Sequence, residues 1–136
     1  MVCELVHDPL FLAQKSLPAE KADSPVFTDL KDTLNAHLDG CVGMAANMIG
    51  VKKRMIVFLN GPFMMVMANP VITAKSGEYE AQEGCLSLAG VRKAKRWQKI
   101  TVSYQDEQFR PCITSFQGFT AQIIQHEMDH CDGILI

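Results

Sequence analysis

Residues 119–131 read FTAQIIQHEMDHC, a run that contains neither glycine nor proline. Ile123, Ile124 and Met128 recur at helical spacing and give this run an apolar face. Gly133 follows just beyond the run, in a position where helices commonly end. The run therefore predicts a helix near the C-terminus that packs its apolar face on the rest of the chain.

The rest of the chain predicts a second helix and a set of short strands. Residues 24–38 favour the helix, because Ser24 can cap it and Pro25 fits its first turn. The expected strands, which are rich in Val, Ile and Met, cover residues 42–48, 54–59, 64–69, 91–97, 100–104 and 112–116. Turn signals between them lie at residues 60–62, 76–77 and 106–107. The expected fold class is α+β, with antiparallel β-sheets packed around the C-terminal helix in a single domain over residues 1–136.

Composition and charge argue against a protein that binds DNA or spans a membrane. The 136 residues are 48% apolar and 21% charged, with 13 Lys and Arg against 15 Asp and Glu. No apolar run approaches the length of about 18 residues that a membrane span needs. The N-terminus carries Glu4, His7 and Asp8 where a signal peptide needs basic and then apolar residues. We therefore expect a cytoplasmic location.

The chemistry of the C-terminal helix is carried by H-E-M-D-H at residues 126–130. Residues four apart lie on one helix face, so His126 and His130 can bind the same metal ion. Glu127 is placed to take a proton from a water molecule that this ion polarises. The alternative is a pair of histidines that only cap or solvate a helix end. Because H-E-x-x-H rarely arises by chance, the metal site is favoured.

A catalytic metal site needs a third protein ligand and an open position. Six residues follow His130, and Cys131 among them points about 100° away from it around the helix. The third ligand is therefore expected upstream, where Cys85 follows Gly84 in E-G-C-L-S. The five cysteines form no C-x-x-C pair, so the alternative for Cys85, as for the other four, is a buried structural thiol.

Two motifs taken together resemble those of the peptide deformylase family. They are E-G-C-L-S at residues 83–87 and Q-H-E-M-D-H at residues 125–130. A third family element, G-φ-G-φ-A-A-x-Q with φ apolar, is matched in part by C-V-G-M-A-A-N-M at residues 41–48. The order and spacing of all three fit the family, and the resemblance extends from Asp8 to Ile136.

The resemblance implies a hydrolase that removes the formyl group from formyl-methionyl nascent peptides and releases formate. It implies one divalent metal ion, Fe(II) with Zn or Ni as substitutes, held by Cys85, His126 and His130. Glu127 would act first as a base and then as an acid. The oxyanion would be stabilised by the metal ion, by the backbone N–H of Leu86 and by one side-chain amide.

Met48 stands where the family has the glutamine that supplies this amide. A thioether donates no hydrogen bond, and losing one oxyanion donor typically costs about 10²–10³ in kcat. Asn47 cannot simply replace it, because neighbouring side chains on a strand face opposite ways. Either Met48 is tolerated, or another donor enters the site, or the chain is a catalytically weak or inactive relative that binds formylated N-termini or the ribosome. A general metallopeptidase is a third hypothesis, which the lack of a downstream ligand disfavours.

The resemblance also implies which residues contact the substrate. They are Val42, Gly43, Leu86, Arg96, Phe119 and Ile123. The first three would border the peptide backbone, and the last two would wall a pocket for the methionine side chain. From the residues alone, a bend explains Gly43 equally well, and packing on a sheet explains Phe119 and Ile123. Glu83 is expected to orient a metal ligand, and residues 92–99 hold five positive charges that are either solvated or in transient contact with ribosomal RNA.

Overall fold

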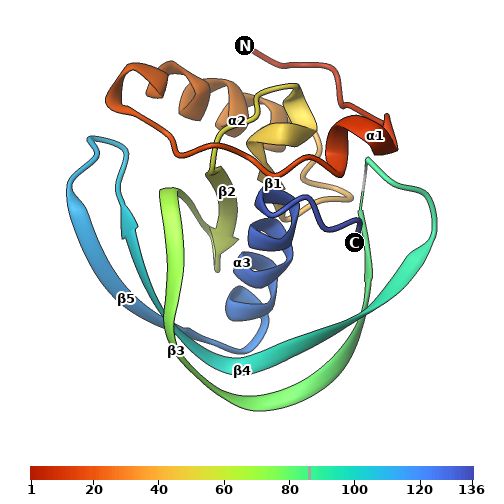
Figure 1. Cartoon of the computed structure of the whole chain (residues 1–136), viewed down its shortest axis with the longest axis vertical. Coiled ribbons are helices and arrows are strands. Elements are labelled where there is room, and N and C mark those ends of the chain that lie inside the picture. The colour runs from red at the N-terminus through yellow and green to blue at the C-terminus, as the bar shows by residue number, and fades with distance from the viewer. Residues whose placement is uncertain (86) are drawn as a thin grey trace.

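The computed structural model describes residues 1–85 and 87–136. Its helical elements are α1 (Pro9–Leu12), η1 (Lys21–Asp23), α2 (Pro25–Asn35), η2 (Ala46–Ile49) and α3 (Gly118–Cys131). Its strands are β1 (Gly43–Ala45), β2 (Met55–Asn60), β3 (Phe63–Gly84), β4 (Val91–Gln105) and β5 (Pro111–Gln117). The strands form one antiparallel sheet in the order β1-β2-β3-β4-β5, and Figure 1 shows this sheet curving around α3. The expected α+β class is confirmed.

Helix α3 occupies the centre of the fold and begins one residue before the predicted helix. Ala121, Ile124 and Cys131 of α3 are buried in one apolar cluster. Ile56 of β2 and Ile100 of β4 belong to the same cluster, so the concave side of the sheet and α3 share a core. Burial of this helix face is the main reason that the segment is helical here, since short helices are marginal without tertiary packing.

Helix α2 covers the opposite face of the β1–β2 end of the sheet. Phe27, Leu30 and Leu34, which lie on one helix face, are buried in a second apolar cluster with Met48 of η2 and Met55 of β2. The helix begins at Pro25, as expected, but ends at Asn35, before the expected end at residue 38. None of the helices in the described part of the chain is long and apolar enough to cross a membrane.

The two longest strands correct the sequence prediction. The sequence predicts a turn at residues 76–77, but β3 runs through it and stays paired with β4 on both sides. Gly77 has φ 76°, which costs glycine little, so the ladder continues past it. The strands expected at residues 91–97 and 100–104 are likewise one strand, β4, because β3 pairs with both parts. The ribbon formed by β3 and β4 reaches α3 at its end, where Glu83 of β3 contacts His126. Cys85 follows β3 directly at this position.

The third family element, at residues 41–48, is only partly a strand. The sequence predicts one strand over residues 42–48, but β1 ends at Ala45, and Asn47 and Met48 lie on the 3₁₀ turn η2. Gly50 ends this turn with φ 85°, a left-handed conformation that favours glycine. The side chains of Asn47 and Met48 therefore diverge as they do on a helical turn, which decides what each of them contacts.

Candidate active site

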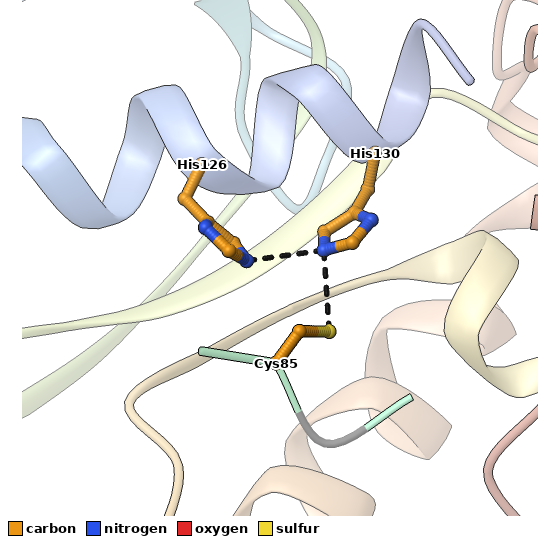
Figure 2. A group of neighbouring side chains, drawn as sticks. All are labelled: Cys85, His126 and His130. Carbon is orange, nitrogen blue, oxygen red and sulfur yellow. Dashed lines mark hydrogen bonds between the residues drawn. The ribbon is translucent and has the colours of Figure 1, made fainter. Parts of the chain in front are cut away.

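Three side chains with metal-ligand atoms meet beside α3, as Figure 2 shows. His126 and His130 point from consecutive turns of the helix toward Cys85. The two Nε2 atoms are 3.1 Å apart, and Sγ of Cys85 lies 3.4 Å from Nε2 of His130. All three ligand atoms lie within 4.8 Å of one another. The fold thus brings together the three residues that the sequence assigns to the metal.

The donor set fits a divalent metal ion. Thiolate and imidazole are ligands that zinc and iron take in proteins, and donors about 2.0–2.3 Å from a tetrahedral ion lie roughly 3.3–3.6 Å from one another. Two of the three separations, 3.1 and 3.4 Å, are close to these values, and the third is at most 4.8 Å. When Nδ1 of His126 donates its proton to Glu83, the Nε2 lone pair of His126 points into the cluster and is available to an ion. The chemistry and spacing of the cluster therefore fit a metal ion.

Glu83 orients His126 from the far side of the ring. Its Oε1 lies 2.8 Å from Nδ1 of His126. A proton on Nδ1 that is donated to this carboxylate leaves the Nε2 lone pair free to bind a metal ion. Burial raises the pKa of Glu83, but hydrogen bonds from His126 and Arg96 outweigh burial and lower this pKa to about 2. The carboxylate that holds the ring is therefore ionised.

Arg96 lies behind this pair and does not line the cavity of the site. Its side chain is only 4% exposed, and its guanidinium donates to both carboxylate oxygens of Glu83 at 2.6 and 2.9 Å. It also donates to Oδ2 of Asp129 at 2.7 Å. These hydrogen bonds to Glu83 and Asp129 engage the guanidinium of Arg96 in a buried, bidentate ion pair. The structure therefore corrects the expectation that Arg96 contacts the substrate: it anchors the carboxylate that holds His126.

Glu127 places a carboxyl group in the wall of the site. The residue is 4% exposed, and its Oε1 has no hydrogen-bond partner among residues 1–85 and 87–136. Burial raises the pKa of Glu127 to about 7, although the charge of His126 opposes this. A carboxyl group with a pKa near neutrality can both accept a proton and return it. This is the pair of roles that the hydrolysis of an amide requires.

A cavity of about 760 Å³ is lined by Cys85, His126 and Glu127, and Nε2 of His130 lies 3.1 Å from Nε2 of His126. The lining includes most of the residues that the sequence assigns to the substrate or the oxyanion: Val42, Gly43, Met48, Phe119 and Ile123. Leu86, which the family resemblance assigns to both roles, lies outside the described residues. The arrangement gathers these side chains around one space, and their individual contacts with a substrate stay predictions.

Gly43 is required by the close approach of α3 to β1. A Cβ atom at this position would lie 2.7 Å from Cγ2 of Ile123 and 2.9 Å from Oε2 of Glu127. Both distances are shorter than real Cβ contacts, so any larger residue would force a shift. The sequence suggests room for a peptide or a bend at Gly43, whereas the structure shows room for the helix that carries Glu127.

Met48 brings its thioether, and no amide, to the cavity. The residue is 1% exposed, and its Sδ accepts a hydrogen bond from the backbone N–H of Ala45 at 3.5 Å. Asn47 turns away, and its Nδ2 donates to the backbone oxygen of His130 at 2.9 Å. Asn47 therefore does not replace the missing glutamine, but the reason is the geometry of η2 and not the strand alternation that the sequence suggests.

Two further residues of the cavity are not found by the sequence reasoning. Nδ1 of His7 lies 3.0 Å from the backbone oxygen of Ser87, so the N-terminal segment touches the loop after Cys85. The thiol of Cys41 donates to the oxygen of Gly43 at 3.0 Å, and burial raises its pKa to about 11. No local sequence pattern indicates the contact between His7 and Ser87, because 80 residues separate them. For Cys41 the signal is its replacement of the first glycine of the family element.

The basic run at residues 92–99 does not form a uniformly positive surface. Lys93 and Lys95 face Glu80 and Glu78 across the β3–β4 ladder, at 3.8 and 3.5 Å. Arg96 is buried in its ion pair with Glu83. Cross-strand pairs of opposite charge are a common way to stabilise an exposed ribbon. Solvated, paired charges therefore describe this run better than a strip for RNA.

The fold and the site together define a class of protein: a metal-dependent hydrolase in which a cysteine and the two histidines of H-E-x-x-H are placed to hold one ion. The model of the polypeptide deformylase family matches residues 3–136. The chain is 56% identical to the peptide deformylase of Clostridium beijerinckii over 136 residues, which cover 100% of both chains. This chain belongs to the peptide deformylase family.

Solved structures agree with this assignment. The crystal structure of a peptide deformylase from Legionella pneumophila matches with a TM-score of 0.88 and 32% identity, over 99% of this chain and 83% of that one. The class I type b peptide deformylase from Acinetobacter baumannii, with Met-Ala-Ser bound, matches with a TM-score of 0.89 and 28% identity. That match covers 99% of this chain and 97% of the other.

Proposed function

We propose that this chain removes the N-terminal formyl group from nascent formyl-methionyl peptides and releases formate. The observation that carries the proposal is the cluster of Cys85, His126 and His130, two members of which line one cavity together with Glu127. The alternative, a weak or inactive relative, is not favoured, because the ligand set and the carboxyl are complete. The chain is also similar over its whole length to a peptide deformylase.

The ion that we assign to the site is Fe(II), with Zn or Ni as substitutes. Ferrous iron is the choice that the family resemblance implies, and the mixed sulfur and nitrogen donor set accepts all three metals. When bound, such an ion polarises the formyl carbonyl and makes water a stronger nucleophile at neutral pH. Cys85, His126 and His130 hold it, while Glu83 keeps the ring of His126 in the tautomer that binds through Nε2.

Glu127 moves the proton. Water adds to the formyl carbon, the C–N bond breaks, and the products are formate and a free amine. Glu127 takes a proton from the attacking water and delivers it to the leaving nitrogen, so one carboxyl serves both steps. Its position in the cavity wall and its pKa of about 7, raised by burial, support this role. By the family resemblance, the backbone N–H of Leu86 stabilises the oxyanion.

Strand β1 offers backbone groups to an extended peptide, because it is the edge strand of the sheet. The oxygen of Val42 accepts from the N–H of Leu59 at 2.9 Å, so Val42 turns its backbone toward β2. Bonded and non-bonded positions alternate in an antiparallel ladder, so Gly43 turns its N–H and C=O the other way. Since Gly43 lines the cavity, a substrate can add there as a further strand, bordered by Val42 and Leu86.

Phe119 and Ile123 form the wall that we assign to the methionine side chain. Both line the cavity from the first two turns of α3, and Phe119 is 64% exposed, which leaves its ring available to a ligand. The Acinetobacter baumannii protein binds Met-Ala-Ser, a peptide that begins with methionine. Because the proposed substrate is a nascent chain, we place the reaction in the cytoplasm, with transient ribosome contact.

Formate release from formyl-Met-Ala-Ser tests the function. The protein is prepared without oxygen, because ferrous thiolate sites are sensitive to oxidation, and is loaded with ferrous iron. It should then release one formate for each peptide consumed. A chelator should abolish turnover, and added Fe(II) should restore it. Unformylated Met-Ala-Ser should stay intact, and its cleavage would indicate a general metallopeptidase. A folded, iron-loaded protein that releases no formate would contradict the proposal.

Met48→Gln is expected to raise kcat by about 10- to 100-fold with little change in KM. The amide N–H would supply the oxyanion donor that a thioether cannot provide, and one such donor is typically worth about 10²–10³. Met48→Leu is the matched control, because it fills the same space without a donor and should leave kcat near the parent value. Equal rates for the two variants would show that another group already donates to the oxyanion.

A further inference from the structure

We infer that Asn47 is a positioning residue for the metal ligand His130. Asn47 lies on η2, in the third family element, and is 1% exposed. Its Nδ2 donates to the backbone oxygen of His130 at 2.9 Å, across 83 residues of sequence. This is a direct link between the turn that forms one wall of the cavity and the residue that holds one side of the metal site.

The link acts at the end of α3. The helix ends at Cys131, so the oxygen of His130 is one of the last four carbonyls, which lack helical N–H partners. This oxygen accepts a hydrogen bond from the N–H of Gly133, just beyond the helix, at 3.1 Å, and a second one from Nδ2 of Asn47 on η2. The last turn of the helix is thereby held from outside the helix as well as by its own backbone.

The two histidine ligands are held in different ways. Oε1 of Glu83 is hydrogen-bonded to Nδ1 of the His126 ring at 2.8 Å. The Nδ1 atom of His130 is buried and has no hydrogen-bond partner in the described part of the chain. The ring of His130 is fully buried, so its position follows the backbone that carries it. Asn47 fixes the backbone of His130, whereas Glu83 fixes the ring of His126. Each of the two residues thus positions one histidine ligand.

This inference rests on the proposed function only in taking the three-ligand cluster as the metal site, and its test needs no turnover. Asn47→Ala in the full chain should weaken zinc binding by about 10- to 100-fold, the range that outer partners of metal ligands typically contribute. Competition with a chromogenic chelator measures the Kd for zinc. The visible spectrum of the cobalt-substituted protein should shift, because the histidine moves relative to Cys85.

Asn69→Ala is the matched control. Asn69 is a part-buried asparagine whose side chain bonds to the backbone of Ala19 and to Oε1 of Gln105, and to none of the three ligands. Asn69→Ala should lower the Tm of the metal-free protein without changing the zinc Kd or the cobalt spectrum. If Asn47→Ala does not fold, Asn47→Ser, which keeps a small polar side chain, takes its place.

Two outcomes separate the inference from the proposed function. An Asn47 variant with a lower Tm but the parent's zinc Kd and cobalt spectrum would overturn the inference and leave the function standing. A parent protein that binds zinc, loses affinity in the Asn47 variant and yet releases no formate would overturn the function and support the inference.

Discussion

Glu127→Gln is expected to lower kcat by about 10²–10⁴-fold while the protein keeps its metal ion. Glutamine has the size and shape of glutamate, but its amide cannot accept and return a proton near neutral pH. Glu127 is not one of the three clustered ligands, so the metal content and the Tm should stay close to those of the parent. Formate release and metal analysis on the same preparation measure the two quantities.

Glu80→Gln is the matched control for this experiment. Glu80 lies on β3, its side chain is 69% exposed, and its nearest cation is Lys93 at 3.8 Å. The variant should retain the parent's kcat, since it removes the same charge at the surface. A Glu127→Gln protein within a few-fold of the parent would mean that another group moves the proton. Loss of the metal from that protein would show that Glu127 helps to hold the ion.

Gly43→Ala is expected to lower kcat by about 10²-fold, because a displacement of about 1 Å at a reacting group costs this much. The added methyl would lie 2.7 Å from Ile123 and 2.9 Å from Oε2 of Glu127. Ile123 is a branched, buried side chain with little freedom to withdraw, whereas the carboxyl of Glu127 ends a flexible chain. The carboxyl therefore gives way, and the contact with Ile123 is relieved only by a shift of α3 against β1. Both movements take Glu127 from the position at which it moves the proton. Steady-state kinetics of formate release measure the effect.

Gly40→Ala is the control for a glycine of the same cavity. Gly40 also lines the cavity, but a Cβ atom there would meet nothing within 4 Å, so kcat should not change. The split between kcat and KM decides the role of Gly43. If Gly43→Ala raised KM and left kcat intact, Gly43 would be needed for peptide binding and not for the position of the Glu127 carboxyl.

The site was predictable where it depends on local geometry or on a strong motif. His126 and His130 share a face because any helix returns to the same side after four residues, whatever surrounds it. Cys85 was suggested by its chemistry and singled out by the family resemblance, and the structure places it 3.4 Å from His130. The strand prediction failed at residues 76–77, because a turn signal in the sequence carries no information about the partner strand that keeps β3 extended.

The α+β class and the helix with its two imidazoles could be predicted from the amino-acid sequence, because periodicity and side-chain chemistry act over a few neighbouring positions. Cys85 required the family resemblance as well. Three contacts could be found only in the folded chain: the ion pair of Arg96 with Glu83, the close approach of α3 to Gly43, and the hydrogen bond from Asn47 to His130. These contacts join segments up to 84 residues apart, from Gly43 to Glu127. Their distances are set by the way the whole sheet closes on α3, which no local preference of the residues specifies.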